Sequence, residues 1–211
     1  MAWDCACGSG QATLDLAARF TSVIATDLSE KQVAEAPTDP RVTYRVAPAQ
    51  DSGIAARSID LVTVAQALHW LDLPRFYAEV ERVLRPAGVL AVWTYGMLVV
   101  EGSTIDAEIQ HFYRHVVGPY WPPERRLVET GYRDLPFPFA ERSNPSFAIE
   151  VRWTLEHLLG YIRSWSATGR YVEQQGIDPV VGLERRVRPL WSDPRQTRLV
   201  SWPLALRVGS A

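Results

Sequence analysis

Cysteine and lysine are scarce in this 211-residue sequence, and arginine supplies almost all of the positive charge. The two cysteines, Cys5 and Cys7, stand where a strand is expected to run into a turn, so they are poorly placed to bridge each other. The four histidines are scattered, and no further cysteine completes a zinc site. These absences exclude a disulfide framework and a cysteine-based zinc centre. We expect two reduced thiols in a cytoplasmic protein that holds no metal.

An excess of charge of one sign is also absent, as is a long apolar run. The formal net charge is −2 at pH 7, which leaves no basic surface for nucleic acid or an anionic membrane. The longest mostly apolar run, residues 89–100, is interrupted by Thr94 and Gly96 and is too short to span a bilayer. No signal peptide is recognisable. We expect a small-molecule partner rather than nucleic acid or membrane, and the oligomeric state stays open.

Short apolar runs alternate with helical patterns over the first 96 residues. The runs are near-continuous, as in parallel strands buried on both faces, and a capping box of Ser29 and Gln32 opens one helix. The expected strands cover residues 22–26, 41–46, 59–65 and 88–95, and the expected helices cover residues 11–20, 29–36 and 73–88. The alternation predicts an α/β fold, a doubly wound and mostly parallel Rossmann-like sheet with helices on both faces.

The pattern loosens after residue 96, and prolines concentrate in residues 118–145. Residues 156–167 and 178–191 have helical patterns, and residues 147–155 and 199–208 are expected to form strands. These late strands predict an antiparallel pair at one edge of the sheet, with Pro203 at an edge or bulge. We interpret residues 1–211 as one domain, in which residues 1–96 bind a cofactor and residues 97–211 form the acceptor side.

The stretch "DCACGSGQA" at residues 4–12 has two close glycines, Gly8 and Gly10, after an expected strand. A dinucleotide fingerprint needs a third glycine where Thr13 stands, which disfavours a nicotinamide oxidoreductase. The carboxylate of Asp4 repels a pyrophosphate but suits an ammonium group, whereas free N–H groups at the start of the next helix favour a carboxylate. A zwitterionic amino-acid tail fits both halves of this turn.

Asp27 ends the next expected strand, nineteen residues after Gly8. A carboxylate at that position can accept hydrogen bonds from both hydroxyls of a ribose. A ligand with a ribose and an amino-acid tail is S-adenosylmethionine. The plainer interpretation is a tight turn followed by a surface aspartate.

These motifs together resemble one family. "DCACGSGQA", "ATDLS", "IDLVTVAQALHWLD" and "RVLRPAGVLAVW" occur in the order found in class I S-adenosylmethionine-dependent methyltransferases. The chain is most similar to the small-molecule subgroup of methyltransferase type 11, related to trans-aconitate methyltransferases, whose late segments resemble "LLGYIRSWSA" and "WPLALRVG". The resemblance spans nearly all of residues 3–209.

The resemblance implies a cofactor site along the strand ends. Asp4 would lie near the ammonium of the cofactor, Asp27 at the ribose, Leu28 on the adenine and Gln66 close to the methyl group. The implied cofactor-binding residues are Asp4, Ala6, Cys7, Gly8, Gly10, Asp27, Leu28, Ala49, Gln50 and Gln66.

Two positions depart from the family pattern. Ala6 replaces the commonest first glycine, which is a familiar change to another small residue. Pro48 replaces an aspartate that binds the adenine amine in many relatives, so adenine recognition here is expected to depend on Gln50 and the backbone.

Methyl transfer is an in-line displacement that depends on alignment and needs no metal. We expect Gln66 and His69 to be catalytic, with His69 as base or hydrogen-bond partner; the alternative is a histidine that only packs. The expected acceptor-contacting residues are Trp70, Tyr95, Trp121 and Trp165. Arg163 could pair with an acceptor carboxylate, but a solvated helix arginine is the favoured interpretation.

Two functions follow. The first is a methyltransferase acting on a small molecule, at a carboxylate or a hydroxyl; the second is a non-catalytic S-adenosylmethionine-binding module or partner subunit. The acceptor itself is not named by any motif. Only three residues precede Asp4 to build the central strand, so we also expect a truncated N-terminus, with weak cofactor binding and low turnover.

Overall fold

The computed structural model describes residues 1–143 and 145–210 and divides the chain into two compact units. The first unit comprises Met1–Tyr95, Thr130–Ser146 and Leu204–Ala211, and the second comprises Gly96–Glu129 and Phe147–Pro203. The elements of the first unit are β1 (Ala2–Cys5), α1 (Thr13–Ala17), β2 (Val23–Asp27), α2 (Glu30–Ala34), β3 (Val42–Val46), β4 (Ile59–Ala65), a 3₁₀ turn (Leu68–Trp70), α3 (Leu73–Val83), β5 (Leu84–Tyr95) and β7 (Ala140–Arg142).

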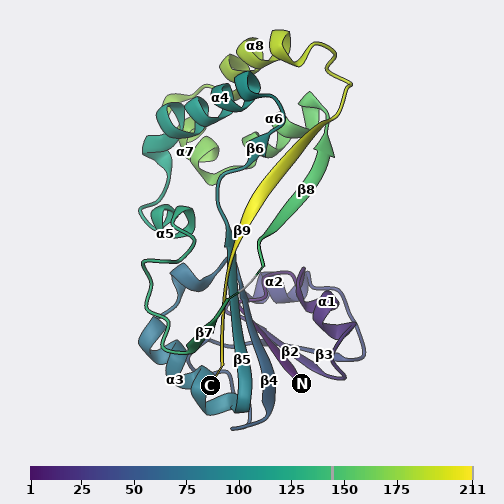
Figure 1. Cartoon of the computed structure of the whole chain (residues 1–211), viewed down its shortest axis with the longest axis vertical. Coiled ribbons are helices and arrows are strands. Elements are labelled where there is room, and N and C mark those ends of the chain that lie inside the picture. The colour runs from purple at the N-terminus through teal and green to yellow at the C-terminus, as the bar shows by residue number, and fades with distance from the viewer. Residues whose placement is uncertain (144, 211) are drawn as a thin grey trace. The chain divides into compact units, whose positions relative to one another are not determined.

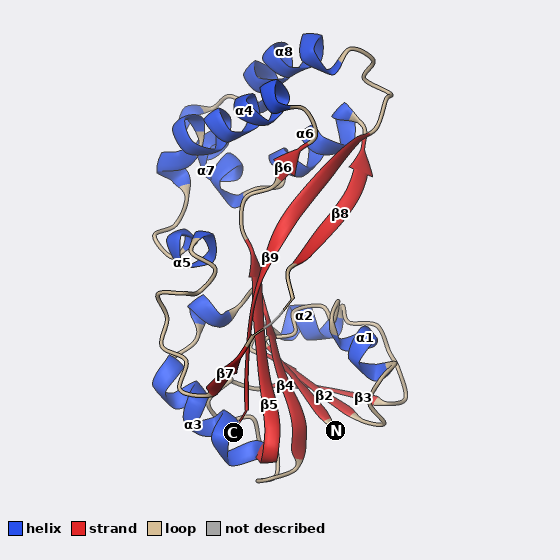
Figure 2. Ribbon diagram, viewed as in Figure 1, coloured by secondary structure: helices blue, strands red, loops and turns tan. Residues whose placement is uncertain are grey.

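The elements of the second unit are β6 (Val99–Val100), α4 (Ser103–His111), a π-helical turn (Phe112–Val116), a 3₁₀ turn (Gly118–Tyr120), α5 (Arg125–Glu129), β8 (Phe147–Trp153), α6 (Leu155–Arg163), α7 (Ser166–Gln175) and α8 (Val180–Trp191). The last strand, β9 (Arg198–Ser210), begins in the second unit and ends in the first. Figure 2 shows the secondary structure along the chain.

The sheet of the first unit has the strand order β3-β2-β1-β4-β5, all parallel, and β9 then pairs antiparallel with β5. Helices α1 and α2 lie on one side of the parallel strands and α3 lies on the other (Figure 1). The predicted doubly wound, mostly parallel sheet with a late antiparallel pair is therefore confirmed.

Strand β1 is buried along its whole length and pairs with β2 on one side and β4 on the other. Trp3 is fully buried, its Nε1–H donates to Thr26 Oγ1 on β2 at 2.9 Å, and its ring contacts Phe76 of α3. On the other side, Thr63 Oγ1 of β4 donates to Asp4 Oδ1 at 2.9 Å. Side-chain hydrogen bonds thus reinforce the backbone register of this short strand on both sides.

The predicted helix 73–88 is wrong at its C-terminal end, because α3 stops at Val83 and the chain enters β5 at Leu84. Pro86 has no N–H to continue a helix, and Ala87 has a left-handed backbone, with φ of 62°. Four residues, 85–88, lie opposite Asp60 alone, since the pairing moves from Ile59–Leu84 to Leu61–Val89. The stop signals of the sequence therefore mark a bulge within the strand.

The predicted capping box at α2 forms only in one direction. Ser29 Oγ accepts from the N–H of Gln32 at 3.3 Å, as a helix cap does. The N–H of Ser29 itself donates to Asp27 Oδ1 at 2.8 Å. The cap of α2 is therefore tied to the carboxylate that ends β2.

The expected helix 156–167 is two helices in the second unit, because α6 ends at Arg163 and α7 begins at Ser166. Aromatic rings pack together in this unit. The ring centroids of Trp153, Tyr161 and Trp202 are 5.2 to 5.3 Å from one another. Pro203 lies on β9 between Leu204, which pairs with β5, and Ser201, which pairs with β6. The missing N–H of Pro203 thus falls where the strand changes partner.

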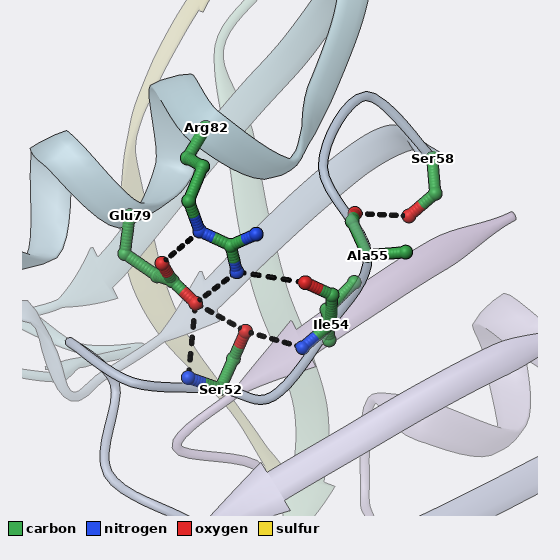
Figure 3. A network of polar contacts seen from close by, with 6 residues as sticks. All are labelled: Ser52, Ile54, Ala55, Ser58, Glu79 and Arg82. Atoms are coloured by element: carbon green, nitrogen blue, oxygen red, sulfur yellow. Dashed lines mark hydrogen bonds and ion pairs between the residues drawn. The ribbon is translucent and has the colours of Figure 1, made fainter.

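A polar network ties the segment between β3 and β4 to α3 (Figure 3). Glu79, 7% exposed, accepts from the N–H and hydroxyl of Ser52 and from two nitrogens of Arg82, at 2.5 to 2.9 Å. Arg82 also donates to the carbonyl of Ile54 at 2.7 Å. The Arg82 guanidinium and the Ser52 donors lower the pKa of Glu79 to about 2.

We expect Glu79→Gln to lower the free energy of unfolding by about 2 kcal/mol at pH 7, because Arg82 and Ser52 lose a charged acceptor. A pKa of about 2 means that the stabilisation is present above the ordinary pKa of 4.5 and is lost as the pH falls towards 2. The difference between parent and variant should shrink over that range in urea unfolding. Glu81→Gln, at an exposed position on the same helix, is the control and should change little; an equal loss in both variants would contradict this role.

Candidate functional site

The carboxyl ends of β1, β2, β3 and β4 surround one pocket of about 400 Å³ in the first unit. Its lining residues all follow or end these strands: Ala6, Asp27, Leu28, Ala47, Ala49, Gln50, Ala67, Trp70, Leu71 and Asp72. In the order β3-β2-β1-β4, the chain adds β2 and β3 on one side of β1 and then continues with β4 on the other side. Open α/β sheets bind ligands at the strand ends where this reversal occurs. The fold therefore makes this pocket the first candidate site.

Two large apolar side chains of the pocket are exposed. Leu28 is 71% exposed and Trp70 is 62% exposed, although both line the same pocket. Much of the remaining wall is alanine, which leaves room for a ligand between flat surfaces. A planar, partly apolar group placed there would cover surface that water now contacts.

Asp27 contributes the carboxylate at the end of β2. Its Oδ2 accepts from the N–H of Gly8 at 2.9 Å, and its Oδ1 accepts from the N–H of Ser29 at 2.8 Å. Each carboxylate oxygen has a second lone pair, so the residue can still accept from a ligand. Asp27 thus joins the glycine turn to the start of α2 and contributes to the pocket wall at the same time.

The two glycines of the turn meet different demands. Gly10 has φ of +82°, and a side chain there would approach the Tyr44 hydroxyl to 2.5 Å. Gly8 has φ of +56° and points its N–H at Asp27. A contact within the protein therefore requires glycine at position 10, whereas Gly8 is favoured by its left-handed backbone, and neither glycine lines the pocket.

Two residues other than glycine are left-handed at the ends of adjacent strands. Ala6 follows β1 with φ of 55°, and Gln66 follows β4 with φ of 54°. Such backbone strain in a side chain-bearing residue concentrates at functional sites. Both strands turn away sharply at the point where the pocket opens.

The side chain of Gln66 is held by β5. Its Oε1 accepts from Thr94 Oγ1 and from the N–H of Tyr95 at 3.0 Å, and its Nε2 donates to the carbonyl of Tyr95 at 3.3 Å. The predicted sites Gln66 and Tyr95 are thereby brought together, although neither lines the pocket. The amide supports the sheet edge, and a part in catalysis stays a prediction.

His69 lies on the 3₁₀ turn after β4, with Nδ1 2.8 Å from the hydroxyl of Tyr132 and its ring 4.6 Å from that of Trp70. Tyr132 is fully buried, and Arg207 of β9 donates to its carbonyl at 2.8 Å. The sequence did not reveal Tyr132, because it lies 63 residues from His69 in the proline-rich stretch. The histidine is thus oriented by a fixed hydroxyl, next to a pocket residue.

Residues 3–92 match the model of a methyltransferase domain family, Methyltransf_11. A provisionally named type II methyltransferase from Anaeromyxobacter dehalogenans has a solved structure that is 45% identical, with a TM-score of 0.94 over 99% of this chain and 88% of that chain. The chain belongs to the class I S-adenosylmethionine-dependent methyltransferases.

A provisionally named methyltransferase of Dictyostelium discoideum is 34% identical over 176 residues, which cover 82% of this chain and 66% of the relative. CRG1 of Saccharomyces cerevisiae, provisionally named an S-adenosylmethionine-dependent methyltransferase, is 35% identical over 44% of this chain and 34% of its own length. The matches thus span two thirds or less of these curated relatives. A Bacillus halodurans structure at 17% identity and a TM-score of 0.52 shares the fold alone.

The pocket fits the cofactor of this family. The expected cofactor residues Ala6, Asp27, Leu28, Ala49 and Gln50 line it together with Trp70, which was expected on the acceptor side. Sequence reasoning missed four lining residues, Ala47, Ala67, Leu71 and Asp72. Their signal was present, because all four follow the expected strands 41–46 and 59–65 at the same sheet edge.

Asp4 and the cysteines of the motif lie outside the pocket. Asp4 is 1% exposed and accepts from Thr13 and Thr63 hydroxyls at 2.6 and 2.9 Å, while its burial raises its pKa. Burial, with the charge of Asp4 nearby, raises the pKa of the Cys7 thiol to about 12 and that of Cys5 well above its usual value. Neither thiol is a nucleophile at neutral pH.

Within residues 1–143 and 145–210, no group of three histidine, cysteine or acidic side chains could hold a metal ion. Over the same residues, no helix has the length and apolar character needed to cross a membrane.

The remaining expected acceptor residues, Trp121 and Trp165, meet in the second unit with ring centroids 5.8 Å apart. Trp121 lines a separate pocket of about 320 Å³, while Trp165 contacts Tyr113 at 5.6 Å. Arg163, interpreted from the sequence as a solvated helix arginine, is ion-paired in the structure, with Nε 2.9 Å from Asp178 Oδ2 and Nη2 3.8 Å from Glu184 Oε2.

We expect Ala6→Gly to raise the free energy of unfolding of the methyltransferase by about 0.5–1 kcal/mol, because glycine adopts φ of 55° without the strain of a Cβ. Urea unfolding without cofactor measures it. Ala78→Gly, at an exposed position inside α3, is the matched control and should lose about 1 kcal/mol. Destabilisation by both substitutions would show that Ala6 is not strained.

Proposed function

We propose that this chain transfers a methyl group from S-adenosylmethionine to a small-molecule acceptor, at a carboxylate or a hydroxyl. The observation that carries the proposal is the pocket at four parallel strand ends, in which Asp27, Leu28 and Trp70 converge. An anionic acceptor of hydrogen bonds beside two exposed apolar side chains suits a ribose joined to a flat ring.

In this proposal Asp27 binds the ribose hydroxyls, and Leu28 and Trp70 enclose the adenine. Ala49 and Gln50 form the wall after β3, where Pro48 offers no N–H. The network around Glu79 begins at Ser52, two residues after Gln50, and holds this wall against α3. The cofactor supplies an electrophilic methyl group on a sulfonium.

The residues of the chain contribute alignment and, for a hydroxyl acceptor, removal of a proton. In this proposal the imidazole of His69, oriented through Nδ1 by the Tyr132 hydroxyl at 2.8 Å, is the group that receives that proton. A carboxylate acceptor is already deprotonated at neutral pH and needs only orientation. Gln66, held by Thr94 and Tyr95, is a rigid group at the end of β4.

A non-catalytic cofactor-binding module is the second candidate. The observation in its favour is that the side chain of Gln66 is engaged by β5, so this predicted catalytic group has a structural role as well. The two functions differ in turnover and agree in cofactor binding.

We expect calorimetry to show binding of S-adenosylhomocysteine and none of NAD. Asp27→Ala should weaken S-adenosylhomocysteine binding by about 1–3 kcal/mol, because the ribose hydroxyls lose a charged acceptor. Asp51→Ala, at an exposed aspartate just beyond Gln50, should leave affinity unchanged. If the parent binds NAD instead, or if Asp27→Ala binds as tightly as the parent, the placement of the cofactor is wrong.

We expect Gln66→Ala and His69→Ala to lower turnover more than they weaken cofactor binding, because their contacts serve the transition state. Methyl transfer to a panel of carboxylic acids and alcohols, with calorimetry of the same preparations, separates the two effects. Parental rates in either variant would remove that residue from catalysis. Cofactor binding without transfer to any acceptor would favour the non-catalytic module.

A further inference from the structure

The second unit has a pocket of its own with a marked excess of positive charge. It measures about 320 Å³, and its ionisable lining comprises three guanidinium groups, on Arg114, Arg125 and Arg126, against the single carboxylate of Glu129. We propose that this pocket binds an oxyanion, a carboxylate or a phosphate, attached to a flat apolar body, and that Arg125 is its principal ligand. The binding of this anion stands independently of the proposed function.

Arg125 is held in one orientation by its aromatic neighbours. Its Nε–H donates to the hydroxyl of Tyr113 at 2.7 Å. Its guanidinium lies 4.6 Å from the ring centroid of Trp121 and 5.5 Å from that of Tyr113. Cation–π contact and one hydrogen bond thus fix the plane of the group before any ligand arrives.

The terminal nitrogens of Arg125 are not used by the protein. In the part of the chain that the structure describes, neither Nη1 nor Nη2 has a hydrogen-bond or ion-pair partner. A guanidinium whose Nε is occupied and whose Nη atoms are open presents two parallel donors, the geometry that matches a carboxylate or phosphate. The arrangement is already formed, so binding costs little side-chain entropy.

The neighbouring charges favour an anion as well. Neither Arg114 nor Arg126 forms an ion pair with any described carboxylate, and Glu129 accepts a hydrogen bond from the Tyr113 hydroxyl at 2.5 Å. Other arginines of the same unit are ion-paired, as Arg163 is with Asp178 and Arg186 is with Glu108. Three guanidinium groups without an ion pair among the described residues therefore give this one pocket a local excess of positive charge.

The lining also indicates what carries the oxyanion. Trp121, Pro122 and Pro123 give the pocket apolar walls. A neighbouring pocket of about 370 Å³ shares Tyr113, Arg114 and Glu129 with it and adds Met97 and Gln110. The walls formed by Trp121, Pro122 and Pro123 therefore suit an apolar body, and an aromatic carboxylate or aryl phosphate has the required chemistry.

The test measures binding of benzoate, phenyl phosphate and uncharged benzyl alcohol to the full chain by chemical-shift titration and tryptophan fluorescence. We expect at least one anion to bind, more weakly at high salt, and benzyl alcohol to bind at least tenfold more weakly than that anion. Whichever anion binds more tightly identifies the oxyanion as carboxylate or phosphate. Binding of neither anion, or equal binding of benzyl alcohol, would overturn the proposal.

Three variants assign the site. Arg125→Met should weaken anion binding at least tenfold, and Arg125→Lys, which keeps the charge but not the paired donors, should lie between it and the parent. Arg185→Met, at an exposed arginine of α8 with no ion pair among the described residues, is the control and should bind like the parent. Equal affinity in parent and Arg125→Met would remove Arg125 from the site, and thermal melting checks that each variant is folded.

S-adenosylhomocysteine binding, measured on the same proteins, keeps the two proposals apart. Retained cofactor binding with no anion binding contradicts this site and leaves the proposed function standing. Anion binding without cofactor binding supports the site and contradicts the proposed function.

Discussion

The parallel register of β1 between β2 and β4 is the constraint on which the first unit depends. The strand has four residues, all buried, and Asp4 lies opposite Ala25 on one side and Thr63 on the other. A slip of one residue would exchange the two faces of the strand and separate Trp3 from Thr26. Because all three strands point the same way, their carboxyl ends meet at one edge, and the pocket exists only as a consequence of that register.

The glycines in the turn at this edge of the sheet have different structural roles. Gly10 makes room for Tyr44, and Gly8 directs its N–H to Asp27. The left-handed turns at Ala6 and Gln66 deflect the chain without glycine. The backbone geometry around the pocket is thus maintained by contacts within the protein, including those that Asp27 makes with Gly8 and Ser29.

Arginine has contrasting roles in a chain where it provides almost all the positive charge. Arg82 and Arg207 are joined to carboxylates and backbone carbonyls, and they anchor loops. Arg125 is anchored through Nε and by stacking, while its terminal nitrogens lack partners among the described residues. The sequence shows the same residue type at all three positions. Only the structure shows which guanidinium nitrogens have partners, and that difference separates a structural arginine from one that can bind a ligand.

The sequence by itself determined the alternation of strands and helices and the doubly wound sheet. It also determined the strand ends that carry Ala6, Asp27, Leu28 and Gln50. Both follow from the sequence because hydrophobic periodicity and turn-forming residues are local properties of the chain. The sequence misplaced the end of α3, since the pairing of Leu84 with Ile59 outweighs helical spacing. Only the tertiary structure decided that Tyr132 meets His69, that β5 holds Gln66, and that Arg125 rather than Arg163 is open. These contacts join residues distant in the chain, and their energies depend on packing and on partners that no local pattern records.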